Sequence, residues 1–386
     1  MSRIERAVTI ADLRTLAQRR LPRSIFEFID GGAGDERTLR DNVDDLARLR
    51  LMPRVGVDVG TRRTAVDLIG ATSALPLVLA PTGLAGLYWP GGEIVAARAA
   101  KQAGIPFCLS TNSVASIEEV AAAVPGGDRW FQLYFLKDPA LMSGMLRRAK
   151  ASGYRVLCMT LDLAVHGRRE RDIRNAFTVP LRPRLRTVAE VLARPAWLAG
   201  FLRNGVRFGN FADAAPSSSG FSSIAQHVAK LCDASATWQT VEAVAREWDG
   251  PFVVKGVLSP EDALHAVELG AEAVIVSNHG GRQLDHVPSA AAALPAVMRA
   301  VAGRAQVILD GGVRRGVDLV KARALGADAC MIGRPFLWGL AAAGEPGVAR
   351  AIEVFREELD IALALLGVPS VDAVDADCLY REASTA

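Results

Sequence analysis

Eight short apolar runs recur along this chain, and each leads through a turn into a segment of helical character. The runs are too continuous in Val, Ile, Leu and Phe for half-exposed antiparallel strands, and they read as strands buried on both faces. Strands that alternate with helical crossovers predict a parallel sheet, and a count of eight favours a closed barrel over an open doubly wound sheet. We therefore predict an α/β fold, a (β/α)8 TIM barrel. The runs are residues 76–83, 106–111, 130–135, 156–162, 252–257, 273–280, 306–312 and 329–334.

Two regions fall outside this pattern. Residues 1–75 precede the first run and contain helical pieces, so we expect an N-terminal helical extension that packs on the barrel. The barrel itself should span 76–366, with a long insertion at 178–236 after the fourth strand. Insertions of this length are generally functional or disordered. Residues 367–386 are expected to form a C-terminal tail.

Composition excludes several classes of protein. The net charge of +3 is too small to indicate a nucleic-acid partner, and no basic run is interleaved with aromatic residues. The five cysteines lack CxxC spacing, so neither a metal site nor a disulfide framework is expected. The sequence contains no apolar stretch long enough for a membrane span, and its first residues lack an apolar signal core. We expect a cytoplasmic protein.

Polar side chains stand at the carboxyl end of almost every predicted strand. In a (β/α)8 barrel the active site assembles at this end, and buried polar groups there need partners that a polar cofactor would supply. This clustering predicts an enzyme. The residues are Thr82, Ser110, Gln132, Tyr134, Thr160, Asp162, Lys255, Ser277, His279, Asp310 and Arg334.

The segment SNHGGRQLD (277–285) follows the sixth predicted strand. His279 and Arg282 stand three residues apart on a glycine-containing turn, so both side chains can converge on one small ligand. Arginine presents a fork that matches a carboxylate, and histidine exchanges a proton near neutral pH. In isolation the pair would indicate a core histidine beside a surface arginine. Its place at a strand end favours the functional interpretation.

Two glycine-rich turns follow the seventh and eighth predicted strands. LDGGVRRG (309–316) and IGRPF (332–336) would let backbone N–H groups approach a phosphate, with Arg314 and Arg334 adding charge. The alternative is two ordinary glycine turns. Their neighbouring positions in the barrel favour a phosphate site.

Three further charged residues complete the chemistry. Lys255 ends an apolar strand, where a lysine needs a negative partner, and it could form a Schiff base or stabilise an anionic cofactor. Asp162 could orient a histidine and stabilise its protonated form. Arg169 could be a second carboxylate anchor, although a mixed-charge run such as RRERD is usually a solvated face.

At these residues the sequence resembles the FMN-dependent L-2-hydroxy acid oxidase and dehydrogenase family, and in particular its mandelate and lactate dehydrogenase branch. The resemblance extends from about residue 10 to about residue 370. It depends on specific motifs in a fixed order: LPRSIFEFIDGGAGDE, APTG, FQLY, TLD, VKG, SNHGGRQLD, DGGVRRG and IGRP.

The resemblance implies a role for each matching residue. His279 would remove a proton from the substrate and Asp162 would pair with the imidazolium, while Lys255 would face the N1/O2 edge of FMN. Carboxylate and substrate contacts would come from Arg282, Arg169, Tyr134 and the residue at position 28, here Phe28. The flavin would be lined by Pro81, Thr82, Gly83, Ser110, Gln132, Thr160 and Ser277. The ribityl and phosphate portion would be held by Asp310, Gly312, Arg314, Gly333 and Arg334.

Three positions bear on the substrate and the electron acceptor. Phe28 replaces a tyrosine that is usual in the family, which removes a hydrogen bond worth roughly 0.5–1.5 kcal/mol and is consistent with a different substrate. Asn112 stands where glycolate oxidase-like members carry an aromatic residue, which opens the pocket and argues against glycolate. Gly83 resembles the dehydrogenases, whereas many oxidases have alanine.

The basic and apolar stretch at 178–211 has the longer form of the dehydrogenases. Arginine beside aromatic and aliphatic residues suits an interfacial segment, so we expect peripheral contact with the inner face of the cytoplasmic membrane. The alternative is a mobile lid over the active site. Its residues include Arg182, Arg184, Arg186, Arg194, Arg203 and Arg207 beside Leu192, Trp197, Leu198, Phe201 and Phe208.

The sequence and the resemblance therefore predict FMN-dependent oxidation of an aromatic or medium-sized, mandelate-like L-2-hydroxy acid to the 2-keto acid, with electrons passed to a quinone or another acceptor. The family further implies a homotetramer. Alternatives are an oxidase that reduces O2 to H2O2, an FMN enzyme that acts on a larger tailored substrate, and a catalytically silent barrel that serves as a scaffold.

Overall fold

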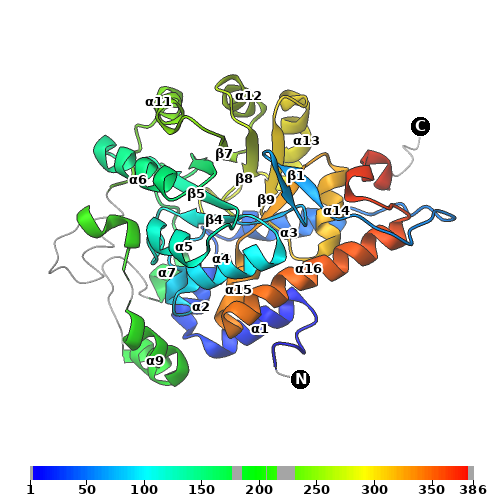
Figure 1. Ribbon diagram of the computed structural model, residues 1–386. Coiled ribbons are helices and arrows are strands. Elements are labelled where there is room, and N and C mark those ends of the chain that lie inside the picture. The colour runs from blue at the N-terminus through cyan, green and yellow to red at the C-terminus, as the bar shows by residue number, and fades with distance from the viewer. Residues whose placement is uncertain (1–2, 176–184, 206, 215–230, 381–386) are drawn as a thin grey trace.

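The computed structural model describes residues 3–175, 185–205, 207–214 and 231–380. Its centre is a closed barrel of eight parallel strands, in which each strand pairs with the next along the chain and the last pairs with the first (Figure 1). Each of the eight predicted runs contains one of these strands or coincides with it to within one residue, so the predicted barrel is confirmed. The strands are β3 (Leu77–Leu79), β4 (Phe107–Ser110), β5 (Arg129–Tyr134), β6 (Val156–Thr160), β7 (Phe252–Val257), β8 (Ala273–Ser277), β9 (Gln306–Asp310) and β10 (Ala329–Ile332).

Helices surround the barrel and bury the outer face of its strands. Burial on both faces is what the continuous apolar sequences of the strands require. Several helices begin at a side chain that accepts a hydrogen bond from the first turn, as Ser116, Asp138, Ser259 and Ser289 do. The helices of the barrel and its C-terminal end are α4 (Gly92–Ala103), α5 (Ile117–Ala123), α6 (Pro139–Ala151), α11 (Trp238–Trp248), α12 (Pro260–Glu268), α13 (Ala290–Val301), α14 (Gly316–Ala324), α15 (Arg334–Ala343) and α16 (Glu345–Leu366).

The N-terminal extension contains the expected helices α1 (Ile10–Arg20), α2 (Arg23–Asp30) and α3 (Arg37–Arg48). It also contains a feature that the purely helical prediction missed, an antiparallel hairpin of β1 (Val66–Leu68) and β2 (Ala71–Ser73). The two-residue turn of the hairpin has positive φ at both positions, 53° at Ile69 and 72° at Gly70, as tight hairpins require. A non-glycine residue at the first position hides this turn from sequence patterns.

The insertion after β6 begins with α7 (Glu170–Arg174) and continues with α8 (Leu185–Leu192), α9 (Pro195–Asn204) and a short helical turn at Gly209–Ala214. Parts of the predicted segments 178–211 and 178–236 lie outside the described residues, and Arg182 and Arg184 are among them. The same holds for 381–386 of the predicted tail. No helix in the described ranges is long and apolar enough to cross a membrane.

Candidate active site

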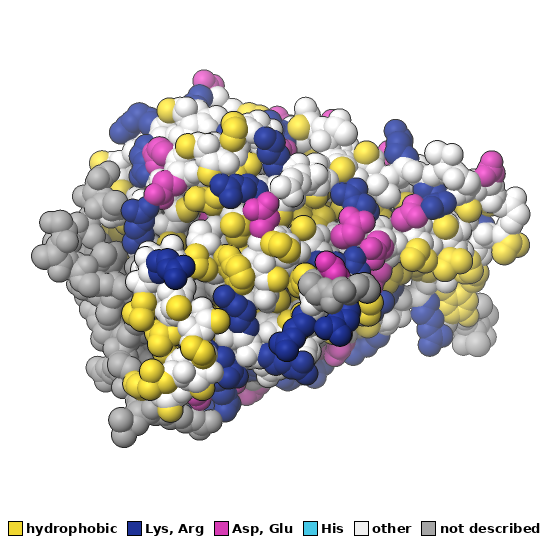
Figure 2. Space-filling model, turned by 60° about the horizontal axis from the view of Figure 1, so that its bottom comes forward, with side chains coloured by type: hydrophobic (Ala, Val, Ile, Leu, Met, Phe, Trp, Pro, Cys, Tyr) yellow, Lys and Arg dark blue, Asp and Glu magenta, His cyan; other side chains and the backbone are white. Residues whose placement is uncertain are grey.

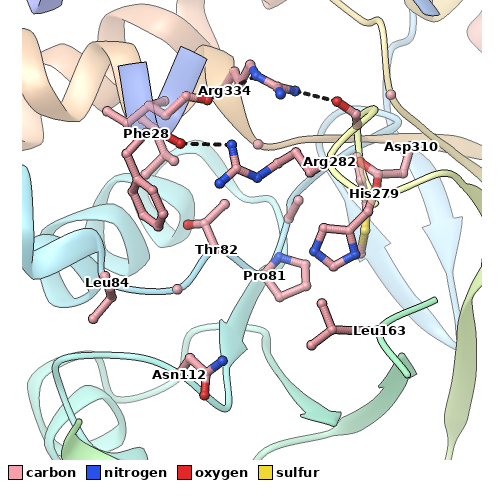
Figure 3. Close-up of a pocket in the computed structure, with 18 of the residues that line it drawn as sticks. Phe28, Pro81, Thr82, Leu84, Asn112, Leu163, His279, Arg282, Asp310 and Arg334 are labelled. Carbon is pink, nitrogen blue, oxygen red and sulfur yellow. Dashed lines mark hydrogen bonds between the residues drawn. The ribbon is translucent and has the colours of Figure 1, made fainter. Parts of the chain in front are cut away.

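A cavity of about 540 Å³ opens at the carboxyl ends of the barrel strands, within the usual range for a ligand site (Figure 3). Residues from many separate stretches of the chain line it, from α2 to the first turn of α15. Fourteen of the predicted site residues are among them: Phe28, Pro81, Thr82, Gly83, Tyr134, Arg169, Lys255, His279, Arg282, Asp310, Gly312, Arg314, Gly333 and Arg334.

Five other predicted residues lie behind the wall of this cavity. Ser277 and Asp162 hydrogen-bond to residues that line the cavity. The Ser110 hydroxyl donates to Gln132 Oε1 at 3.2 Å, and Thr160 is buried at the end of β6 and lines a smaller neighbouring cavity. The structure thus brings all nineteen predicted positions to one end of the barrel.

The turn after β8 directs its two key side chains into the cavity. Three successive residues, His279, Gly280 and Gly281, have positive φ. A Cβ at Gly281 would lie 2.6 Å from the backbone nitrogen of Leu39, so only glycine fits between this turn and α3. The tight turn explains how His279 and Arg282, only three residues apart, come to face one space (Figure 3).

His279 stands between a carboxylate and a phenol. Its Nδ1 lies 2.8 Å from Asp162 Oδ1, and its Nε2 lies 3.4 Å from the Tyr134 hydroxyl. Burial acts to raise the pKa of Asp162, but the His279 charge and hydrogen bond, together with the Lys255 charge, outweigh it and lower the pKa. Asp162 therefore stays ionised and can stabilise a protonated imidazole.

Four arginines line the cavity, and none of them forms an ion pair with a carboxylate in the described part of the chain. Arg282 donates through Nη1 to the carbonyls of Phe28 (2.8 Å) and Gly31 (3.0 Å), which leaves Nε and Nη2 for a ligand. Burial, and then the Arg282 charge, lower the pKa of Arg169 to about 9. Buried guanidinium groups without counter-charges favour anionic ligands.

Lys255 has the negative partner that its burial requires. Its Nζ lies 2.7 Å from Asp310 Oδ2 and 2.9 Å from Ser277 Oγ, and Ser277 donates to the same carboxylate oxygen at 2.7 Å. Burial acts to lower the pKa of Lys255, but the Asp310 and Asp162 charges outweigh it and raise the pKa. The lysine is a fixed cation, which makes a Schiff-base role unfavourable at neutral pH.

The predicted phosphate residues Arg314 and Arg334 line the cavity after β9 and β10, across the barrel from β5 and β6. Within the described part of the chain, the Arg314 guanidinium donates only to the carbonyl of Val313 (2.8 Å), and burial lowers its pKa to about 10. Arg334 differs from the prediction in part, because its guanidinium donates to the carbonyls of Ile29, Gly31 and Gly280. It therefore also holds two loops together and has fewer N–H groups for a phosphate than Arg314.

Some buried polar atoms in this region lack a hydrogen-bond partner, and they allow a test of whether FMN fits the site. Gln132 Nε2 and Thr160 Oγ1 are buried and have no hydrogen-bond partner among the described residues. Such groups are costly unless a ligand satisfies them. Gln132 and Thr160, on β5 and β6, offer polar groups for an isoalloxazine ring. Arg314, after β9 on the other side of the barrel, offers a cation for a phosphate, so the two sides match the two ends of FMN.

Four of the lining residues, Tyr88, His166, Asp172 and Phe208, were given no role in the active site by sequence reasoning, although Phe208 was named in the basic and apolar stretch. Burial raises the pKa of Asp172 to about 6, although the Arg282 and Arg169 charges act to lower it. Asp172 follows Arg169 by one helical turn, so its spacing could have revealed it. Nothing in the local sequence of Tyr88 or Phe208 marks either residue.

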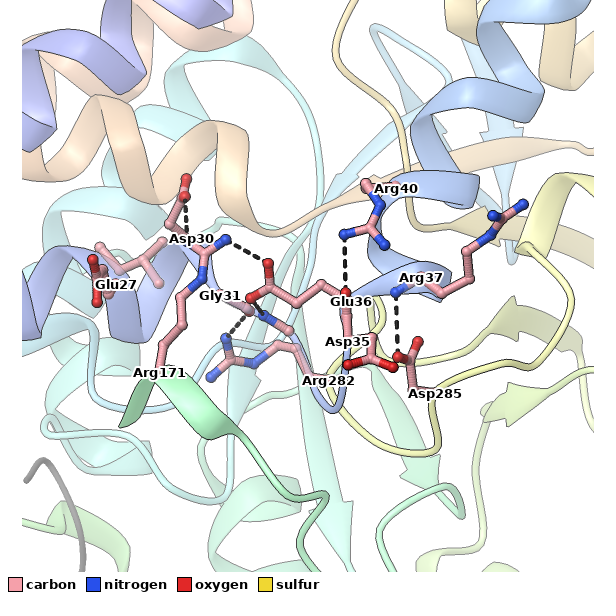
Figure 4. A network of polar contacts seen from close by, with 12 residues as sticks. Glu27, Asp30, Gly31, Asp35, Glu36, Arg37, Arg40, Arg171, Arg282 and Asp285 are labelled. Carbon is pink, nitrogen blue, oxygen red and sulfur yellow. Dashed lines mark hydrogen bonds and ion pairs between the residues drawn. The ribbon is translucent and has the colours of Figure 1, made fainter. Parts of the chain in front are cut away.

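A polar network fastens the N-terminal extension to the rim of the site (Figure 4). Arg171 of α7 contacts Asp30 (3.3 Å) and Glu36, while Asp285 Oδ1 accepts from the backbone N–H of Thr38 at 2.8 Å. The segment that carries Arg169 and the loop that carries Arg282 are therefore both held against residues 30–38.

These features define an FMN-binding barrel enzyme. Its cavity holds an imidazole–carboxylate pair and arginines that form no ion pair among the described residues, and its polar groups fit FMN. The chain matches the model of the FMN-dependent dehydrogenase family over residues 17–381, and it belongs to that family. It is an FMN-dependent oxidoreductase that acts on CH–OH groups.

Similar proteins cover nearly the whole chain. An L-lactate dehydrogenase of Pseudomonas aeruginosa is 44% identical over 375 residues, 96% of this chain and 97% of the relative. One of Caulobacter vibrioides is 45% identical over 366 residues, 94% and 95% of the two chains. A crystal structure of the monotopic membrane protein (S)-mandelate dehydrogenase has a TM-score of 0.94 and 38% identity, covering 98% of this chain and all of that one. A crystal structure of mandelate oxidase has a TM-score of 0.83 and 39% identity, covering 97% and 98%.

Proposed function

We propose that the protein oxidises an L-2-hydroxy acid to the 2-keto acid, with His279 as the base and Arg282 and Arg169 as anchors of the carboxylate. One observation carries this proposal: an imidazole hydrogen-bonded to a carboxylate faces the same cavity as arginines that form no ion pair with a carboxylate among the described residues. An acid that must lose a proton beside its carboxylate needs both elements.

Each residue has a defined task. Arg282 and Arg169 bind the carboxylate and so fix the α-carbon with respect to His279. His279 removes one proton through Nε2, the ring nitrogen that faces the cavity, and Asp162 on Nδ1 stabilises the resulting imidazolium. Tyr134, 3.4 Å from Nε2, can donate to the substrate oxygen, and burial raises its pKa so that it stays a donor.

FMN, when bound, would supply the acceptor for the two electrons and the second proton that leave the substrate. Lys255, Gln132 and Thr160 would hold its ring, while Arg314, Gly333 and Arg334 would hold its phosphate. The fixed positive charge of Lys255 would favour electron transfer, because it stabilises negative charge on its side of the cavity.

A medium-sized or aromatic substrate side chain is supported by the lining of the cavity. Phe28, Leu84, Leu163 and Phe208 present apolar surface, and Asn112 leaves more room than an aromatic residue would. The names of the relatives point to lactate and mandelate as the first acids to test.

A quinone in the membrane is the acceptor that we favour, with O2 as the alternative. Support for the quinone comes from relatives named as dehydrogenases and from a structural neighbour described as a monotopic membrane protein. Support for O2 comes from the mandelate oxidase structures, of similar identity. We place the protein at the inner face of the cytoplasmic membrane and retain the homotetramer as a prediction.

Anaerobic flavin bleaching tests the proposal. The yellow protein is mixed without oxygen with glycolate and with each enantiomer of lactate and mandelate, and absorbance is followed. We expect bleaching by an L-2-hydroxy acid and not by its mirror image. Failure of every acid would refute the proposed function, and air that restores the colour with stoichiometric peroxide would favour the oxidase.

A further inference from the structure

Two tyrosine hydroxyls face the cavity, and only one of them has a task so far. Tyr134 lies against His279. Tyr88 follows the short helical turn Ala85–Leu87 after β3 and is almost completely buried, with 2% of its surface exposed. Its hydroxyl has no hydrogen-bond partner in the described ranges, and it is not among the fully buried side-chain atoms that lack a partner. It therefore opens on the cavity.

Tyr88 lines the same cavity as Arg282 and Arg169. Among the charged groups, Arg282 and Asp172 act most strongly on the Tyr88 phenol, whereas Asp162 and Lys255 act most strongly on that of Tyr134. Asp162 is the carboxylate that is hydrogen-bonded to His279. These contributions agree with a position of Tyr134 near the base and of Tyr88 near Arg282.

Tyr88 is also held in a fixed position. The guanidinium of Arg20 donates to its carbonyl at 3.3 Å and lies over the neighbouring Trp89 ring, 4.1 Å from the ring centre. Burial raises the pKa of Tyr88, so the phenol remains a neutral donor at neutral pH. A donor that is buried, fixed and unpaired next to a guanidinium suits an anionic acceptor.

We propose that the Tyr88 hydroxyl donates a hydrogen bond to the carboxylate of the bound acid and shares that group with Arg282. Phe28, whose ring lies 5.3 Å from the Arg282 guanidinium, has no hydroxyl to offer there. This inference depends on the proposed function, because it assigns a further contact to the same substrate.

The variant Tyr88→Phe removes one oxygen atom and keeps the buried ring. Binding is measured by the change of flavin absorbance with unreactive ligands, either phenylacetate and benzoylformate or propionate and pyruvate, whichever pair the wild-type protein binds. A hydrogen bond to a charged group contributes about 1.5–3 kcal/mol, so both ligands of the pair should bind roughly 10- to 100-fold more weakly. Tyr154→Phe is the matched control, because its buried hydroxyl donates to the carbonyl of Ile117 (3.0 Å) away from the cavity.

The two ligands separate the outcomes. Phenylacetate and propionate lack the α-oxygen. Weaker binding of the keto acid alone would therefore show that Tyr88 contacts this oxygen, and it would overturn the assignment to the carboxylate. Unchanged binding of both ligands would refute any substrate contact. In either case a wild-type protein that is still bleached by a 2-hydroxy acid would leave the proposed function standing.

Discussion

His279 has a left-handed backbone, with φ of +58°, and a residue with a side chain adopts this conformation at a cost of about 1–3 kcal/mol. The turn persists because Ser277 Oγ accepts from the His279 N–H at 3.0 Å and the Asn278 amide pairs with that of Asn42 at 2.8 and 2.9 Å. These contacts offset local strain and set the direction of the imidazole. The strain is thus part of how the site is built.

His279→Ala should retain FMN, because the imidazole is not needed to hold the ring or the phosphate. Loss of a general base lowers turnover by roughly 10²- to 10⁴-fold, and we expect the rate of anaerobic flavin reduction to fall by that factor. His286→Ala is the control, since this side chain lies on the same loop and is 67% exposed. A yellow His279→Ala protein with near wild-type reduction would disprove the assignment of the base.

The sequence was informative where function is carried by short local patterns. His279 and Arg282 could be predicted because a strand end and a glycine turn place them together within four residues. Tyr88 could not, because its entry into the cavity depends on how the turn after β3 packs under Arg20. The shared role of Arg334, which also binds the α2 carbonyls, was hidden for the same reason: both partners come from distant parts of the chain.

At the scale of elements, α3 begins without a cap from its own sequence. Glu36 precedes it with a left-handed backbone and no capping side chain. Asp285, from the loop after β8, accepts from the first N–H groups of the helix at Arg37 (3.2 Å) and Thr38 (2.8 Å). The same loop carries Arg282, so this cap couples the stability of α3 to the position of the active-site loop.

Asp285→Asn should destabilise the protein in a pH-dependent manner. Burial acts to raise the pKa of Asp285, but the backbone N–H groups of Thr38 and Arg37 outweigh it and lower the pKa from 3.8 to about 2. The folded state therefore favours the ionised carboxylate, so its stabilisation is complete above about pH 4 and is lost as pH falls towards 2. We expect the variant to lose about 0.5–2 kcal/mol at pH 7, the range for a helix cap, and less at pH 3.

Urea unfolding at pH 7, 4 and 3 measures this difference. Asp35→Asn is a suitable control, because Asp35 lies nearby with a side chain that is 83% exposed. A gap between the wild type and Asp285→Asn that stays constant, or widens, as pH falls would contradict the role of the charged cap.

The eight barrel strands could be predicted because burial on both faces leaves short continuous apolar runs that recur eight times, each followed by a turn and a helical segment. The β1–β2 hairpin could not. Its strands have three residues each, too few for a pattern, and its turn places Ile69 rather than glycine or asparagine at the first position of positive φ.

At the scale of the whole molecule, the insertion after β6 has one side that contacts residues around the active site and another that faces outward. Asn210 is buried under the turn after β4, where its Nδ2 donates to Thr111 O (3.1 Å) and Ser113 Oγ (3.0 Å). Trp197 of α9 donates to the carbonyl of Leu87 at 2.9 Å, one residue before Tyr88. The helices α8 and α9 are therefore fixed to the residues around the cavity.

The outer side of these helices carries apolar residues that nothing in the described structure covers. Val188, Leu192 and Leu202 are 45%, 64% and 72% exposed. Figure 2 shows hydrophobic and basic side chains close together on the side of the molecule where α9 lies. Apolar residues flanked by Arg194 and Arg203 suit an anionic bilayer surface, because the side chains enter the interface while the arginines remain among the headgroups.

Replacing Leu192 and Leu202 with aspartate should therefore release the protein from membranes. Each buried leucine contributes roughly 1.5–3 kcal/mol, and the added carboxylates are repelled by anionic lipid, so binding to phosphatidylglycerol vesicles should fall by well over tenfold in a sedimentation assay. Leu365→Asp is the matched control, since Leu365 is 74% exposed on α16, outside this insertion. Flavin reduction by the hydroxy acid should be unchanged in both proteins, because neither leucine lines the cavity. If the double variant sediments with vesicles as the wild type does but reduces its flavin slowly, then α8 and α9 cover the active site and do not anchor the protein.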